Sequence, residues 1–98
     1  MNKNLPWFFE QFAKNDPEYC SQLAEVLEVA AKPEKLDAKT KYLIILALDV
    51  LKGAGEGVKV LAKQARDQGA SEDEIREVIR LAFYVNSMDV IKTSLNAY

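Results

Sequence analysis

Few side chains in this 98-residue sequence could carry out acid–base or thiol chemistry. The chain has no histidine and a single cysteine, Cys20. A nucleophilic thiol needs a basic neighbour or a helix N-terminus, because the thiolate is the attacking species. Cys20 lies near a predicted helix start, but Asp16 and Glu18 are beside it, and acidic neighbours disfavour a thiolate. We interpret Cys20 as a structural residue, and a lone cysteine also excludes an intramolecular disulfide.

Carboxylates are the remaining candidates. Glu25, Glu28 and the acids between residues 72 and 77 are typical of solvated helix faces. Without histidine or a cysteine cluster, a zinc or iron site would need carboxylates alone, so we expect no metal and no cofactor. Glu56 is either a helix-start acid that favours the macrodipole or a general base that faces a pocket together with Tyr42. Glu56 and Tyr42 are therefore the catalytic candidates.

A glycine-rich segment, Gly53-Ala54-Gly55-Glu56-Gly57, shares only its glycines with a nucleotide-binding turn. Such turns follow a strand within a βαβ unit. Here the preceding residues predict a helix, no Lys-Ser/Thr follows, and the Glu56 carboxylate would repel a phosphate. We instead predict a corner between two helices, with Gly53 in the left-handed conformation after the basic residue Lys52.

Polar caps mark the predicted helix starts: Asp16 before Pro17, Asp37, and a capping box formed by Ser71 and Glu74. Each cap places a side-chain oxygen where it can accept from the free N–H groups of a first turn. No strand signal and no internal repeat is evident. The sequence therefore predicts an all-α fold, a compact bundle of about five to six helices that forms one domain over residues 1–98.

Three of the predicted helices are rich in apolar residues. The helix over residues 43–51 is apolar nearly all the way round, which predicts a central buried helix, partly covered by other subunits. The last helix continues this pattern, and we expect a kink or break in it at Asn86-Ser87.

The predicted first helix, Asn4–Lys14, carries a cluster of aromatic residues, Trp7, Phe8 and Phe12, over two turns. The simpler interpretation is that these rings lock the helix onto the core. The alternative is a contact with another subunit, because aromatic residues are enriched at interface hot spots.

Two sequence segments carry a family resemblance. The first is LDAKTKYLIILAL, and the second is AKQARDQGASEDEIREVIRLA, which contains the end of one predicted helix and the start of the next. In the second segment, one predicted helix ends at Ala-x-x-x-Gly, and the next begins with a small residue and several acidic residues. In this the chain resembles the carboxymuconolactone decarboxylase and alkylhydroperoxidase D-like family, a small all-helical group. The likeness covers roughly Leu36 to Tyr84, and more loosely the helices before it. It implies an alkylhydroperoxidase D-like fold and, for single-domain members, assembly into trimers or hexamers.

Peroxidase-type members of that family carry a Glu on the first helix, a Cys-x-x-Cys at the next helix start, and a His one turn on. With residues 65–69 as the anchor, the corresponding positions are Tyr42, Ala54, Gly57 and Leu61. None retains the family side chain, and no shift of the alignment supplies a histidine. The resemblance therefore implies a family member that lacks the thiol redox site and is not a peroxidase.

Three functions stay open at this point. The first is an oligomeric helical protein of this family without the redox site. The second is a cysteine-independent enzyme of the same fold, a decarboxylase or one acting on a lactone or carbonyl, that uses Glu56 and Tyr42. The third is a helical adaptor that binds another protein. Whether the chain is an enzyme stays open too, since the fold is that of enzymes and no catalytic residue is retained.

Net charge and hydropathy limit the classes of partner that the chain could bind. The net charge is −2, which argues against a nucleic-acid partner. The longest apolar run, residues 42–48, is far shorter than the ~20 residues of a membrane span. The absence of a secretory signal and of cysteine pairs favours the cytoplasm. Helices with this much apolar surface predict a homo-oligomer, and the family resemblance implies that it is a trimer or a hexamer. A small-molecule ligand stays open without an identity.

Overall fold

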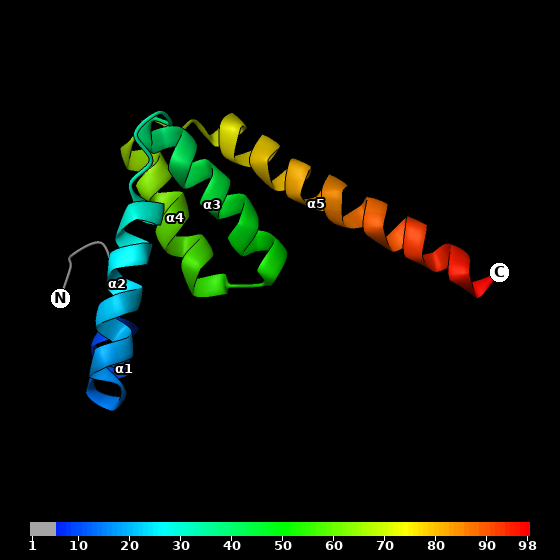
Figure 1. Cartoon of the computed structure of the whole chain (residues 1–98). Helices are drawn as coiled ribbons and strands as arrows, with labels where there is room; N and C mark the ends of the chain where they lie inside the picture. The colour runs from blue at the N-terminus through cyan, green and yellow to red at the C-terminus, as the bar shows by residue number, and fades with distance from the viewer. Residues whose placement is uncertain (1–5) are drawn as a thin grey trace. The chain divides into compact units, whose positions relative to one another are not determined.

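The structure, a computed structural model, describes residues 6–98 and divides the chain into two units, residues 1–35 and 36–98. The first unit holds two helices, α1 (Phe8–Asn15) and α2 (Pro17–Ala31); the second holds α3 (Ala38–Lys52), α4 (Gly55–Asp67), α5 (Glu72–Ser94) and a 3-10 turn, η1 (Leu95–Ala97) (Figure 1). The described residues contain no strand. The predicted all-α class and the predicted number of helices are confirmed.

The first unit is a pair of helices joined at Asp16. The Asp16 side chain accepts a hydrogen bond from the backbone N–H of Tyr19 at 3.3 Å, and Pro17 occupies the first position of α2, as the sequence predicts. Cys20 is 2% exposed, and it is the buried residue among those described in this unit. Its Sγ lies 3.7 Å from the carbonyl oxygen of Phe9, so the thiol contributes to the contact between the two helices.

The aromatic residues at the start of the first unit do not enter a core. Trp7, Phe8 and Phe12 are all exposed, Trp7 by 78%. Helix α1 begins at Phe8 rather than at Asn4, which lies outside the described residues. The prediction that these rings lock the helix onto a core is therefore wrong for this unit. A pair of short helices cannot enclose rings of this size, so the aromatic side chains contact one another and remain open to solvent.

The second unit is built on a hairpin of two helices, α3 and α4, which lie alongside each other (Figure 1). Helix α3 is capped at its start by Asp37, whose carboxylate accepts from the Thr40 N–H at 2.7 Å, and at its end by Gly53. Two side chains of the hairpin are buried, Leu46 at 1% exposed and Ala65 at 0%. These two residues mark the centre of the unit.

Helix α3 is less covered than its composition predicts. Within this chain only Leu46 of α3 is buried, whereas Ile44, Leu48 and Leu51 are exposed by 41–52%. A two-helix hairpin with one further helix covers only part of an apolar cylinder. Within its own chain α3 is therefore only partly buried, and its further cover by other subunits stays a prediction.

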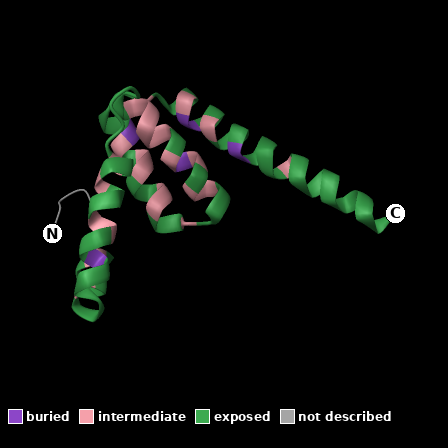
Figure 2. Cartoon of the chain, viewed as in Figure 1, coloured by how far each residue is buried: buried purple, intermediate pink, exposed green. Residues whose placement is uncertain are grey.

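Helix α5 packs on α3 through its first turns only. Ile75 and Ala82 are its buried residues. Beyond Ala82 the helix extends past the hairpin and its residues are almost all exposed (Figures 1 and 2). The predicted break at Asn86-Ser87 is wrong, because α5 is continuous to Ser94. Asn and Ser cost a helix less than ~0.7 kcal/mol each, which is too little to end it.

Candidate functional site

The corner between α3 and α4 is the region where the sequence places its catalytic candidates. Gly53 ends α3 with φ of +71°, and its N–H donates back to the Asp49 and Val50 carbonyls. The Ala54 N–H donates to the Asp49 carbonyl at 2.9 Å. Ala54 then occupies the N-cap position of α4 without a side-chain hydrogen bond, because a methyl group cannot accept one. The predicted left-handed Gly53 is confirmed, and the start of α4 has no side-chain cap.

A carboxylate lies directly over the first turn of α4. A Cβ atom added to Gly57 would clash with the Asp49 carboxylate, whose Cγ would be 3.0 Å away. Gly57 thus leaves room for the Asp49 side chain. Asp49 is half-buried, and within residues 6–98 its carboxylate has no hydrogen-bond or ion-pair partner. The sequence analysis missed this residue; its signal is a single acid within the apolar run from Leu43 to Leu51.

The two catalytic candidates lie apart. Glu56 is in the first turn of α4, its side chain is 92% exposed, and its Oε1 lies 3.5 Å from Lys59 Nζ. Tyr42 is half-buried near the start of α3, where Lys41 Nζ lies 4.9 Å from its ring centroid. Tyr42 is separated from the corner by about ten residues of α3, or ~15 Å. The structure therefore does not bring Glu56 and Tyr42 together within the second unit.

The positions that the resemblance assigns to the family's redox residues lie on both helices of the hairpin. Ala54 and Gly57 flank the start of α4, Leu61 is half-buried two turns into α4, and Tyr42 is on α3. None of these side chains can act as a thiolate or transfer a proton as imidazole does. The chain's one thiol, that of Cys20, belongs to the first unit.

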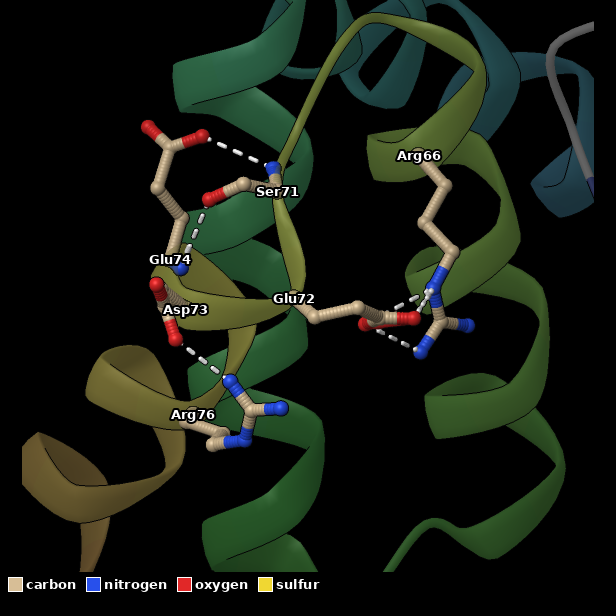
Figure 3. Close-up of polar contacts among 6 residues, drawn as sticks. All are labelled: Arg66, Ser71, Glu72, Asp73, Glu74 and Arg76. Atoms are coloured by element: carbon tan, nitrogen blue, oxygen red, sulfur yellow. Dashed lines mark hydrogen bonds and ion pairs between the residues drawn. The ribbon is translucent and has the colours of Figure 1, made fainter.

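The opposite end of α4, where it leads into α5, is rich in polar contacts (Figure 3). The Arg66 guanidinium donates to the Glu72 carboxylate through Nε at 3.1 Å and Nη2 at 3.0 Å. The predicted capping box is present: the Ser71 hydroxyl accepts from the Glu74 N–H at 3.0 Å, and the Glu74 carboxylate accepts from the Ser71 N–H at 2.9 Å. Lys39 of α3 also donates to Glu74 at 3.0 Å. One small group of side chains thus joins three helices.

Two carboxylates in this unit are held in their charged form. The backbone N–H of Ser71, and then the Lys39 ammonium, lower the pKa of Glu74 from its ordinary value of 4.5. The backbone N–H of Thr40 likewise lowers the pKa of Asp37. Hydrogen bonds to the ionised form cause both shifts. Both carboxylates cap helices, which is a structural role.

The described part of the chain shows no metal-binding group and no membrane-spanning helix. Among residues 6–98, no group of three or more His, Cys, Asp or Glu side chains is placed to hold a metal ion. No helix in the same range is long and apolar enough to cross a bilayer. A shallow, open hollow in the first unit is lined by Ala13, Pro17, Cys20, Ser21 and Ala24, together with two glutamates.

The hairpin with its glycine corner, followed by a capped long helix, defines the chain as a small all-helical protein. The carboxymuconolactone decarboxylase family model matches residues 17–98, and the chain belongs to this family. The matched range is longer than the two segments that carry the resemblance in the sequence, and it includes α2. The chain is also 30% identical over 74 residues to "Uncharacterized protein MJ1511" of Methanocaldococcus jannaschii, which covers 76% of this chain and 69% of that protein.

Proposed function

We propose that this chain is an oligomeric helical member of the carboxymuconolactone decarboxylase family that lacks the thiol redox site and does not act as a peroxidase. In this proposal residues 1–98 form one domain, and the protein works in the cytoplasm as a trimer or a hexamer. Nucleic acid is not a partner, and no cofactor takes part.

The placement of the chain's one thiol carries the proposal. Thiol peroxidase chemistry needs an accessible thiolate next to a group that accepts its proton. Cys20 is 2% exposed in α2, and the chain has no histidine. At the start of α4, Ala54 and Gly57 occupy the positions where the family's peroxidases carry cysteines. The helix N-terminus is present, but the nucleophile is absent from it.

Exposed apolar surface supports the assembly. Exposed apolar side chains occur on every helix of the second unit, and they include Leu48, Val60, Phe83 and Val90, each at least 51% exposed. Large exposed apolar surface often marks a site of interaction with another protein chain. Association of identical chains by closed symmetry is the usual way to cover them.

The other two functions have less support. A general base at Glu56 with Tyr42 as its partner would need the two side chains to converge, and about two-thirds of α3 separates them. An adaptor function would need a surface that distinguishes a foreign partner from a second copy. Neither feature is found in the second unit, so neither function is proposed.

A hydroperoxide-reduction assay with a dithiol donor tests the redox part of the proposal. We expect turnover no faster than the uncatalysed reaction of the dithiol, and the same rate for the Cys20→Ser variant. Hydroperoxide turnover that depends on the dithiol and is abolished by Cys20→Ser would contradict the proposal. Light scattering tests the assembly: a mass near the 11.0 kDa of one chain would contradict the homo-oligomer.

A further inference from the structure

The C-terminal part of the second unit carries a regular row of apolar side chains that no helix of the unit covers. The row recurs at alternating steps of three and four residues, and each member is at least 44% exposed. We call it the α5 seam, and it consists of Leu81, Tyr84, Met88, Ile91, Leu95 and Tyr98. Figure 2 shows this half of the helix as almost entirely exposed.

The α5 seam lies on the side of the helix opposite to the one that packs on α3. At about 100° per residue, Tyr84 and Leu95 lie roughly 180° around the helix from Ile75, which is buried. An average spacing of 3.5 residues is the pattern of a coiled-coil contact. The last step falls in the 3-10 turn η1, where side chains three residues apart eclipse, so Tyr98 continues the line of Leu95.

We propose that the α5 seam pairs with the α5 seam of a second copy of this chain, in antiparallel orientation, about a two-fold axis between Met88 and Ile91. This inference rests on the proposed homo-oligomer, and it assigns one of its contacts. Two-fold contacts are isologous, so one surface pairs with itself.

Side-chain size favours the antiparallel pairing. The seam reads symmetrically from either end, because Leu81 falls opposite Tyr98 of the second copy and Tyr84 opposite Leu95. In the centre, Met88 meets Ile91. Each outer layer then combines one aromatic with one aliphatic side chain, which gives layers of even volume. A parallel pairing would place tyrosine on tyrosine in two layers and leucine on leucine in two others.

The charges beside the seam are also compatible with a second copy. The flanking positions that face each other in the antiparallel pair are Val85 with Lys92, and Ser87 with Ser94. No like charges meet, and the two helix macrodipoles oppose each other favourably. A foreign helix would find few charges here to select it, because Arg80 and Lys92 are the only ionised side chains at these flanking positions.

The area of the seam is sufficient for a stable contact. The two tyrosines of the seam can bury about 150–250 Å² each, and its four aliphatic side chains roughly 60–120 Å² each. Because the six side chains are on average about two-thirds exposed, pairing would remove roughly 400–700 Å² per chain, which reaches the ~1,000 Å² in total that a specific interface needs.

Two neighbouring residues of α5 provide a matched test. Ile91 and Val90 are 58% and 60% exposed, but only Ile91 belongs to the seam. We expect Ile91→Glu to halve the mass of the assembly in sedimentation or light scattering. Val90→Glu should keep the wild-type mass. Circular dichroism should show that both variants are helical. Equal masses for both variants would overturn the seam.

The wild-type mass separates this inference from the proposed function. A wild-type monomer would overturn both. A wild-type trimer would overturn the seam alone, because a two-fold contact requires an even number of chains. A hexamer that Ile91→Glu does not divide would also overturn the seam and leave the homo-oligomer standing.

Disulfide trapping tests the orientation even if a glutamate variant fails to fold. In a Cys20→Ser background, chains with Tyr84→Cys and chains with Leu95→Cys are co-expressed and oxidised. We expect a disulfide between the two kinds of chain and none between two Tyr84→Cys chains, whose thiols would be ~16 Å apart along the helix. The reverse result, or no disulfide of either kind, would overturn the antiparallel pairing.

Discussion

The two ends of α4 are built in opposite ways. At its start, Ala54 offers no cap and the Asp49 carboxylate lies against Gly57 without a partner in the described chain. At its other end, the chain passes into α5 through a capping box and an ion pair between Arg66 and Glu72. One helix thus has an end with few polar contacts and an end with many.

This difference concerns what each end of α4 does for the fold. Capping hydrogen bonds fix the direction in which α5 leaves the hairpin, and that direction must be kept for any assembly. In the proposed function the glycine corner has lost the family's cysteines, and Ala54 and Gly57 carry the small side chains there. Polar contacts are therefore concentrated where α5 begins and are sparse at the glycine corner.

The largest effect is expected at the well-capped end, with Ser71→Ala. The substitution removes the oxygen that accepts from the Glu74 N–H, and loss of such a cap costs about 1 kcal/mol, within a range of ~0.5–2. Chemical denaturation at constant protein concentration measures the change in the free energy of unfolding. Ser87→Ala serves as the control, because Ser87 only donates to the Tyr84 carbonyl at 2.9 Å and satisfies no free helix donor. Equal losses in the two variants would contradict a special role for the cap.

Helix starts and stops could be predicted from the sequence because short-range rules determine them. Asp16, Asp37 and Ser71 cap the helices that their types predict, and Gly53 is left-handed after Lys52. These features depend on residues within one turn of each other. The family could also be recognised from the sequence, because the segments that resemble it lie in one continuous stretch of the chain.

Burial could not be predicted in the same way, because it depends on which surfaces meet. The apolar run of α3 and the aromatic residues of α1 indicate surfaces that are more stable when they are buried. They do not indicate whether this chain or another chain buries them. Asp49 was missed for a related reason. Its position over Gly57 is set by the sharp turn at Gly53, which brings two helices together across a corner.

A smaller effect is expected at the sparsely capped end, with Gly57→Ala. Alanine in place of glycine favours a helix by up to ~1 kcal/mol, but here the new Cβ must displace the Asp49 carboxylate. We expect the substitution to stabilise the Asp49→Ala variant by roughly 0.5 kcal/mol more than it stabilises the wild type. A double-mutant cycle on the free energy of unfolding measures this coupling.

Gly55→Ala is the matched control for that cycle. An added Cβ at Gly55 meets nothing within 4 Å, so its effect should be the same with and without Asp49. If Gly57→Ala also gave equal changes in both backgrounds, the close approach of Asp49 to Gly57 would be refuted.

The smallest effect is expected for Glu56→Gln, at the same end of α4. The Glu56 side chain is 92% exposed, and within residues 6–98 it pairs only with Lys59, at 3.5 Å. An exposed pair three residues apart contributes ~0.2–0.5 kcal/mol, and an acid in the first turn of a helix contributes ~0.3–1 kcal/mol through the macrodipole. The free energy of unfolding should therefore fall by less than ~1 kcal/mol, and by less at high salt because exposed charges are screened. Thermal or chemical denaturation at two salt concentrations checks this.

Because about two-thirds of α3 separates Glu56 from Tyr42, we also expect Tyr42→Phe to give an additive change in the double variant. A clear coupling between the two substitutions would mean that the residues meet, across chains if not within one, and would restore the carboxylate–phenol pair as a candidate for catalysis.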